Sequence, residues 1–251
     1  MIPNTFHFIF GLAEDFGGKP WSLCHYLSVK SALDLNKPEQ AYLYYKFMPE
    51  GKWFDKIKDK LTLVQVDPPN QIYGNKIEHY AHKADVIRLQ NLYRHGGIYM
   101  DLDTISVKPF TSLLNNKCVL GEEKTKEFTG LCNGVILAEK GSEFIKHWIT
   151  SYETFNKDYW NQHSVRIPSK IASQHPDTIH IEPHTSFHYP TWEQDNLPLL
   201  FEENKLFPKA YCHHVWESVT WDKYLKALSI KAINEEDTSY NTIARNYIKD
   251  L

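Results

Sequence analysis

The chain has 251 residues, and 28 basic against 31 acidic side chains give it a formal net charge of −3. This balance, with a pI of about 6.5, excludes a basic tail for polyanions and argues against a nucleic-acid partner. Hydrophobic residues make up 42% and charged residues 24%, as in soluble globular proteins. Because α/β domains can reach ~250 residues, we expect one domain over residues 1–251.

The first part of the chain alternates between strand and helix patterns. A β-branched and aromatic run over residues 4–10 predicts a buried strand, and helical spacing follows over residues 21–35. Residues 41–47 are strand-like, residues 53–60 helical, and residues 61–66 form another β run. Strands that alternate with helices at this spacing indicate an α/β layer architecture with a mainly parallel sheet.

The clearest predicted helix covers residues 77–95, where apolar side chains form one stripe and Gly96-Gly97 ends the pattern. A short apolar strand, residues 98–100, runs directly into Asp101-Leu102-Asp103, and the β pattern resumes over residues 105–107. Two acids therefore stand at the carboxyl end of a strand, where open α/β sheets bind their ligands.

The second part of the chain is less regular. After a turn at Asn133-Gly134, we expect a strand over residues 135–138 and a helix over residues 143–155. Residues 156–209 carry many Pro, His and aromatic residues, and we expect loops and short helices there. The last expected elements are a strand, residues 211–216, and a helix, residues 236–250.

Several features bear on the compartment. The cysteines, Cys24, Cys118, Cys132 and Cys212, have no CxxC spacing, so we expect reduced thiols. No apolar run approaches the ~20 residues that cross a bilayer, and the N-terminus lacks the pattern of a signal peptide. We expect a cytoplasmic protein with no transmembrane segment in this chain, and attachment to the periphery of a membrane stays open.

The Asp-x-Asp sequence at the strand end points to a cation. On an extended chain Asp101 and Asp103 share one face, within reach of a single ion. Oxygen ligands suit Mg²⁺ or Mn²⁺, which proteins commonly hold with one or two carboxylates plus the phosphates of a substrate. A solvated turn is the alternative for the motif taken alone.

The surrounding sequence carries a resemblance. Ala84-Asp85-Val86-Ile87-Arg88-Leu89 is followed by the block from Leu92 to Asp103, and together they resemble the DXD-motif sugar transferases of glycosyltransferase family 32. That family includes yeast outer-chain mannosyltransferases, glycolipid galactosyltransferases and bacterial capsule enzymes. Weaker similarity covers residues 2–11 and residues 211–221.

This resemblance implies a GT-A fold, a Rossmann-like twisted and mostly parallel sheet flanked by helices. A nucleotide-sugar-binding core would span residues 1–140, and residues 141–251 would form the acceptor side. The implied activity is a metal-dependent, retaining transfer of a hexose from a UDP-sugar, favoured over a GDP-sugar. The acceptor would be a hydroxyl of a glycan, a lipid or a protein.

The resemblance also assigns roles to residues. Asp103 would bind Mn²⁺ or Mg²⁺ directly, with Asp101 facing the ion and His213 as a third ligand, for which His214 is the alternative. Asp85 and Arg88 would hold the donor hexose, although a surface ion pair is the plainer reading of two residues one helical turn apart. The expected catalytic residues are Asp101, Asp103, Arg88 and Asp85.

Other residues are expected to contact the substrate. Gly97 would let the backbone approach the sugar. Glu217 and Ser218 would ligate the ion through water, and Trp221 would close over the diphosphate. Core packing and a β-turn are the plainer roles for Phe8 and for Asn133-Gly134. The expected substrate-binding residues are Phe8, Asp85, Arg88, Gly97, Asp101, Asn133, Gly134, Ser218 and Trp221, and Ile9 and Trp21 are further candidates beside the base.

Two other functions stay open at this point. A metal-dependent phosphoester hydrolase could also use Asp101 and Asp103, but it would need a second metal position ~3.5–4 Å away. A non-catalytic carbohydrate-binding module would suit the aromatic content of 15 Tyr, 13 Phe and 7 Trp, because aromatic rings stack on sugar faces.

Overall fold

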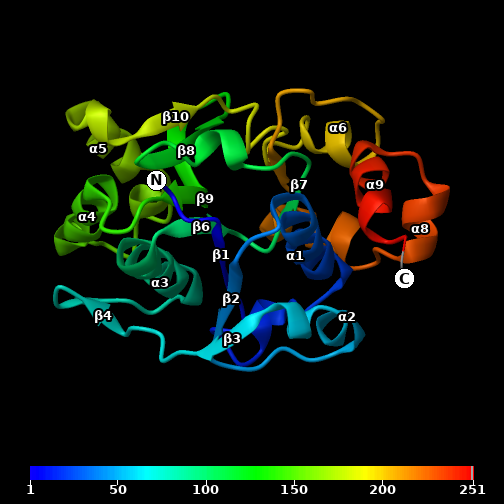
Figure 1. Ribbon diagram of the computed structural model, residues 1–251, viewed down its shortest axis with the longest axis horizontal. Coiled ribbons are helices and arrows are strands. Elements are labelled where there is room, and N and C mark those ends of the chain that lie inside the picture. The colour runs from blue at the N-terminus through cyan, green and yellow to red at the C-terminus, as the bar shows by residue number, and fades with distance from the viewer. Residues whose placement is uncertain (250) are drawn as a thin grey trace.

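The computed structural model describes residues 1–249 and 251, and within them seven strands form one central sheet (Figure 1). The strand order is β10-β8-β9-β6-β1-β2-β3. The mixed α/β architecture with a large, mostly parallel sheet confirms the fold class expected from the sequence. The strands are β1 Thr5–Ile9, β2 Gln40–Tyr45, β3 Thr62–Gln65, β6 Gly97–Met100, β8 Cys118–Lys124, β9 Thr129–Ala138 and β10 His180–Glu182.

Strand β9 is the exception to the parallel arrangement. β1 is parallel to β2 and β6, β2 to β3, and β8 to β10, whereas β9 is antiparallel to both β6 and β8. The connection between β8 and β9 is a tight turn in which Thr125 N–H donates to the carbonyl of Phe128 at 2.9 Å. A turn this short can join only antiparallel neighbours, because parallel strands need a longer crossover.

Two small sheets lie beside the central one. β7 (Thr104–Ser106) pairs antiparallel with β11 (Cys212–His214), so that His214 stands opposite Thr104. β4 (Gln71–Ile72) and β5 (Asn75–Lys76) form a short hairpin. The β7–β11 pair matters for function, because it brings the 212–217 segment beside the Asp-x-Asp sequence.

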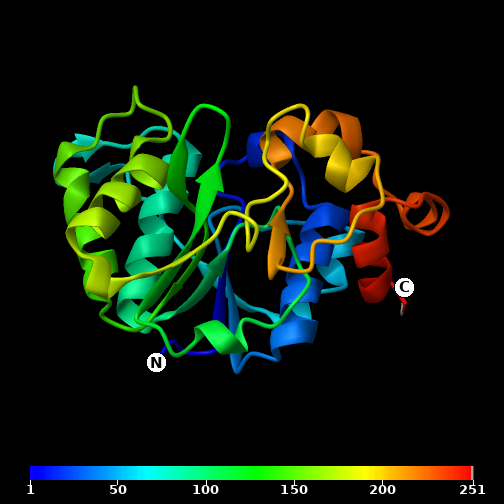
Figure 2. The ribbon, with the colours of Figure 1, turned by 90° about the horizontal axis from the view of Figure 1, so that it is seen from above.

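Helices pack on both faces of the sheet, and Figure 2 shows α3, α4 and α5 on one side and α1 with α9 on the other. Side chains alternate along β6 because successive strand residues point to opposite faces. Ile98 and Met100 join the core on the α1 side, and Tyr99 joins the core beneath α3 and α4. The helices are α1 Leu23–Asn36, α2 Lys52–Asp55, α3 Tyr80–His95, α4 Glu143–Thr150, α5 Ile167–Gln174, α6 Leu197–Phe201, α7 Glu217–Thr220, α8 Ile230–Glu235 and α9 Ser239–Ala244.

Most elements expected from the sequence are present up to residue 107, and the differences gather after it. Strand β8 was missed, and β9 is far longer than residues 135–138. The expected terminal helix is broken, because Thr238 is extended and its side chain accepts a hydrogen bond from Asn241 N–H, which starts a new helix. Asp250 lies outside the described residues.

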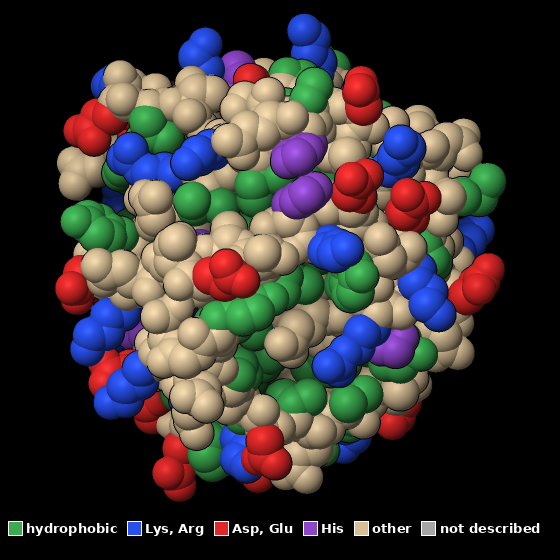
Figure 3. Space-filling model, turned by 90° about the vertical axis from the view of Figure 1, so that its left-hand side faces the viewer, with side chains coloured by type: hydrophobic (Ala, Val, Ile, Leu, Met, Phe, Trp, Pro, Cys, Tyr) green, Lys and Arg blue, Asp and Glu red, His purple; other side chains and the backbone are tan. Residues whose placement is uncertain are grey.

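Three features of the structure bear on its surface, its thiols and its relation to membranes. On the face that carries α4 and α5, acidic and basic side chains are interspersed rather than gathered by sign (Figure 3). All four cysteines lie among the described residues, and each is a buried free thiol. Over the part of the chain that the structure describes, no helix combines the length and the apolar character needed to cross a membrane.

Candidate active site

A cavity of about 500 Å³ opens where β1 and β6 end. Its walls come from segments far apart in the sequence: the loop after β1, helix α3, the β8–β9 hairpin and the segment after β11. A cavity of this size, at the carboxyl ends of strands in an open α/β sheet, has the dimensions and position of a small-molecule site.

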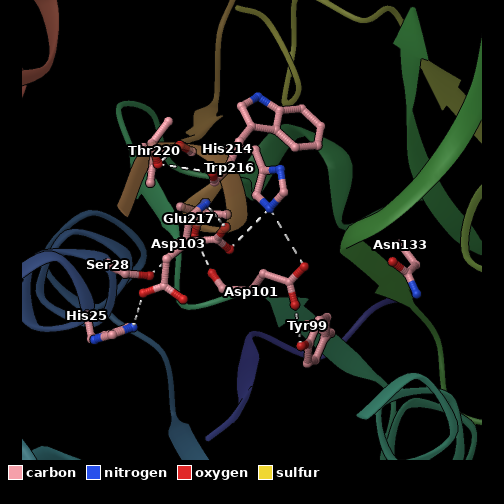
Figure 4. Close-up of polar contacts among 12 residues, drawn as sticks. His25, Ser28, Tyr99, Asp101, Asp103, Asn133, His214, Trp216, Glu217 and Thr220 are labelled. Carbon is pink, nitrogen blue, oxygen red and sulfur yellow. Dashed lines mark hydrogen bonds and ion pairs between the residues drawn. The ribbon is translucent and has the colours of Figure 1, made fainter. Parts of the chain in front are cut away.

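Asp101, Asp103 and His214 meet at one corner of this cavity (Figure 4). One ligand atom from each lies within 4.8 Å of the others. The Nε2 atom of His214 is 3.1 Å from Asp103 Oδ1 and 3.8 Å from Asp101 Oδ2. Two carboxylate oxygens and an imidazole nitrogen therefore face one point.

Backbone hydrogen bonds hold this corner in shape. Asp101 N–H donates to the carbonyl of Gly134 at 2.8 Å, and the hydroxyl of Thr104 donates to the carbonyl of Asp101 at 2.7 Å. Val215 N–H donates to the carbonyl of Asp103 at 2.7 Å. The turn after β6 is thus fixed both to β9 and to the segment that follows β11.

The charges at the corner are strongly coupled. Burial raises the pKa of Asp101, and the neighbouring Asp103 adds to this shift although Arg88 opposes it. Burial acts in the same direction on Asp103, but the charge of His214 and the hydrogen bonds it receives outweigh burial and hold its pKa well below the usual range. For His214, Asp103 overcomes the effect of burial and raises the pKa. The two carboxylates thus stabilise a positive charge between them, which a bound cation would supply in place of the proton on His214.

The structure places His214, the alternative ligand, beside the aspartates rather than the preferred His213. His213 points away from the aspartates, where its Nδ1 is 2.8 Å from the carbonyl oxygen of Tyr189 and its ring packs against Phe207. Adjacent residues of a strand face opposite sides, so His214 takes the position beside Asp103. Which of the two faces the aspartates is set by the register of β11 on β7.

Arg88 is the centre of a second buried network. Its Nη1 is 3.1 Å from Asp101 Oδ1 and donates to the carbonyl of Asn133 at 2.8 Å, and its Nη2 is 3.3 Å from Asp85 Oδ1. The guanidinium also lies over the ring of Tyr99, 4.3 Å from the ring centre. Asp85 in turn accepts from the side-chain amide of Asn133 at 2.7 Å. Asp85 and Arg88 are buried, so a surface ion pair does not describe them.

Glu217 links the corner formed by Asp101, Asp103 and His214 to the loop after β1. Its backbone N–H donates to Asp103 Oδ2 at 2.8 Å. Its carboxylate is 2.9 Å from His25 Nε2 and 3.9 Å from Lys19 Nζ. His25 Nδ1 accepts from Ser22 N–H at 2.9 Å, so the ring proton is on Nε2 and faces Glu217 (Figure 4).

The structure leaves several expected substrate-binding residues outside the cavity. Phe8 is fully buried in the core because it faces the α1 side of β1. Trp221 is buried in the same core, and Trp21 packs against Phe10 and Phe54. A Cβ on Gly97 would meet Thr5 and His7, so its missing side chain makes room for protein rather than for sugar.

Other expected residues do line the cavity or lie beside its Asp101–Asp103–His214 corner. Asn133, Ser218 and Glu217 line it, as does Ile9. A Cβ on Gly134 would lie 3.1 Å from Asp101 Oδ2 and 3.5 Å from His214 Nε2. Gly134 therefore keeps space open beside the three converging ligand atoms.

Sequence reasoning missed other lining residues. Tyr99 donates from its hydroxyl to Asp101 Oδ1 at 2.6 Å, and its position two residues before Asp101 on the same strand face was a signal that could have found it. Lys19, Glu123, Trp160 and Trp192 also line the cavity. No local pattern marked these four, because they come from loops and from a strand that was not predicted.

Solved structures with similar architecture identify the fold. The glycosyltransferase GlyE of Streptococcus pneumoniae superposes with a TM-score of 0.56 over 98% of this chain and 60% of that one, at 14% identity. Mouse xyloside xylosyltransferase 1 superposes with a TM-score of 0.51 over 87% of this chain and 99% of that one, also at 14% identity. At such identities the likeness concerns the fold, which is that of GT-A glycosyltransferases.

Sequence comparison is more specific. Residues 23–120 match the family model described as "Glycosyltransferase sugar-binding region containing DXD motif". "Glucan organizing enzyme 1" of Cryptococcus neoformans var. grubii is 37% identical over 261 aligned positions, which cover 99% of this chain and 71% of that protein. The chain belongs to the DXD-motif glycosyltransferase family, as the block from Ala84 to Asp103 indicated.

Proposed function

We propose that this glycosyltransferase is metal-dependent and retaining, and that it moves a hexose from a nucleoside diphosphate sugar to an acceptor hydroxyl. The observation that carries the proposal is the convergence of Asp101 Oδ2, Asp103 Oδ1 and His214 Nε2 at one corner of the cavity. A UDP-sugar is favoured as donor over a GDP-sugar. The division into a donor core up to residue 140 and an acceptor side after it stays a prediction.

The residues at the corner fit a divalent cation. Arg88 and Tyr99 both contact Asp101 Oδ1, which leaves Oδ2 turned towards His214. On Asp103, Oδ2 accepts a hydrogen bond from the backbone N–H of Glu217, and Oδ1 is left facing His214, as Asp101 Oδ2 does. Two oxygens and one imidazole nitrogen suit Mn²⁺ better than Mg²⁺, which prefers oxygen alone.

Positive charges at the cavity would offset the negative charge of the diphosphate. A cation bound at this corner would act as a Lewis acid that offsets the charge on the departing diphosphate. Arg88 fixes Asp101 and keeps a buried positive charge beside it. Lys19 offers a second positive charge at the cavity wall near Glu217. Both side chains would help to stabilise the negative charge that develops on the diphosphate at this edge of the sheet.

Retention follows from attack on the face that the diphosphate leaves. The acceptor hydroxyl would approach on that face, and a diphosphate oxygen would take its proton, so that position and electrostatics do most of the catalysis. The acceptor is a glycan, a lipid or a protein. The name of the cryptococcal relative refers to glucan, which favours a glycan for this chain as well.

The test begins with nucleotide binding. Calorimetry with UDP, with and without Mn²⁺, should give tight binding only when the ion is present. A screen of UDP-glucose, UDP-galactose and GDP-mannose with Mn²⁺ and no acceptor should then show slow donor hydrolysis for the true donor. Release of phosphate from simple phosphoesters would instead identify a hydrolase, and glycan binding that needs neither nucleotide nor ion would identify a binding module.

Asp103→Asn tests whether the carboxylate of Asp103 is needed for metal binding and turnover. The amide keeps the size of the side chain but removes its charge, so we expect Mn²⁺-assisted UDP binding to disappear and turnover to fall at least about 100-fold. The protein should stay folded, with a lower melting temperature because the pair with His214 is lost. Asp222→Asn is the matched control, since the Asp222 side chain is 92% exposed. Unchanged turnover in Asp103→Asn would refute the assignment.

A further inference from the structure

Two tryptophans line the cavity and yet keep much of their surface in solvent. Trp160 is 60% exposed and Trp192 is 37% exposed. Leaving large aromatic rings in water costs free energy in proportion to their apolar area, and such surface at a cavity usually serves a ligand. Each ring therefore keeps apolar surface for a flat partner, although Trp160 also packs against the rings of His79 and His82.

One hydrogen bond holds the Trp192 indole, and others hold the segment that carries it. Its Nε1–H donates to Glu123 Oε1 at 2.9 Å. Two residues earlier, the carbonyl of Pro190 accepts from Trp216 Nε1–H at 2.8 Å, and the hydroxyl of Thr191 donates to Glu193 at 2.9 Å. A ring fixed in this way loses little conformational entropy when a ligand stacks on it.

Glu123 is the second component of this part of the cavity. It lies on β8, is only 4% exposed, and receives its hydrogen bond from a neutral indole rather than from a base. Among the described lining residues, the lysine and the arginine are Lys19 and Arg88, and both contact other carboxylates. A carboxyl group exchanges hydrogen bonds with hydroxyls, and Lys19 and Arg88 are engaged by other carboxylates, so this part of the cavity fits a neutral sugar better than a phosphate or an acidic sugar.

We propose that Trp192 and Glu123 form the subsite for a neutral sugar ring of the acceptor, with Trp160 of the same cavity as a further stacking surface. The proposal rests on the proposed function and adds the class of acceptor to it. A sugar has an apolar face for the indole and hydroxyls for the carboxylate. A lipid chain offers no hydroxyl to Glu123, so it would leave this carboxyl group unused.

The test measures binding of neutral oligosaccharides by calorimetry, with hexasaccharides of glucose and of mannose as probes, in the presence of UDP and Mn²⁺. We expect the wild type to bind at least one of them, and Trp192→Ala and Glu123→Gln to weaken that binding at least about tenfold. Trp192→Phe keeps an aromatic face and should lose less. Tyr73→Ala is the control, because Tyr73 is 53% exposed on the β4–β5 turn and does not line the cavity.

Two results would overturn the subsite. One is a wild type that binds neither neutral hexasaccharide, and the other is wild-type affinity in both Trp192→Ala and Glu123→Gln. Binding of UDP with Mn²⁺ is measured separately on the wild type, so failure of that step counts against the proposed function. Hexasaccharide binding by a wild type that binds no UDP with Mn²⁺ would identify a binding module and overturn the acceptor role of the subsite.

Discussion

At the scale of single residues, the role assigned to Arg88 differs most between the sequence analysis and the structure. Its spacing from Asp85 suggested either a surface pair or a grip on the donor sugar. In the structure its guanidinium is buried and contacts Asp85, Asp101 and the carbonyl of Asn133. Most of its hydrogen-bonding capacity is used inside the protein, so we expect Arg88 to act mainly by fixing Asp101.

Arg88→Ala should therefore reduce both stability and turnover. Removing one partner leaves Asp85 and Asp101 as buried carboxylates without their shared cation, which costs about 3–5 kcal/mol. The misplaced Asp101 should lower turnover at least about 100-fold, with a smaller change in nucleotide affinity. Denaturant unfolding and steady-state kinetics measure the two effects.

The control for this substitution is Arg94→Ala, on the exposed face of the same helix. Its free energy of unfolding should stay within about 0.5 kcal/mol of the wild type. If Arg88→Ala behaves like Arg94→Ala in both measurements, the buried network contributes nothing to the site.

At the scale of elements, β6 is the strand that positions the site, and its close packing explains the glycine at its start. β6 lies between β1 and β9 and carries Tyr99 and the turn to Asp101. Gly97 has φ = +119°, and a Cβ there would lie 2.5 Å from the carbonyl oxygen of Thr5 and 2.8 Å from His7 Nε2. The strand can approach β1 only because this residue lacks a side chain.

Gly97→Ala should destabilise the sheet. We expect about 1 kcal/mol from the left-handed backbone and about 1–3 kcal/mol from overpacking against Thr5 and His7. Gly51→Ala is the matched control, because Gly51 has φ = +104° and a Cβ added there would have no atom within 4 Å. It should lose only the backbone contribution, as measured by thermal unfolding. Equal losses in the two variants would mean that the contact with β1 is unimportant.

At the scale of the whole molecule, His7 ties three parts of the fold together. From β1, its Nε2–H donates to the carbonyl of Gly96 at 2.8 Å, and its Nδ1 accepts from the hydroxyl of Tyr44 on β2 at 3.0 Å. Tyr42 stacks on the ring, and the charge of His95 at the end of α3 disfavours protonation. Burial is the main cause that lowers the pKa of His7 to about 4.

This shift makes stability depend on pH. Between pH 6.5 and about pH 4, His7 binds a proton in the unfolded chain but not in the folded one. Its contribution is therefore complete above pH 6.5, decreases as the pH falls, and is gone below about pH 4, in total about 3 kcal/mol. Urea unfolding at pH 7.5 and at pH 5 should show a lower free energy of unfolding at pH 5.

His7→Gln tests the source of this pH dependence. The variant should be less stable than the wild type at pH 7.5, and the difference should narrow at pH 5 because glutamine does not titrate. His180→Gln, at an exposed position, should leave the difference between the two pH values unchanged. An identical dependence on pH in His7→Gln and the wild type would assign the effect to other groups.

The sequence by itself determined the α/β architecture, most elements up to residue 107, and the Asp-x-Asp at a strand end. These features depend on side-chain periodicity, helix stops and turn residues, which act between near neighbours in the chain. The family resemblance rested on the same continuous block, from Ala84 to Asp103.

The tertiary structure decided the rest. A shift of one residue in the register of β11 on β7 would bring His213 rather than His214 to the aspartates, and nothing local in the sequence fixes that register. Strand β8, with Glu123, and the loop that carries Trp192 reach the cavity only through long-range pairing and packing. Their positions depend on which distant segments meet, and short-range patterns do not record this.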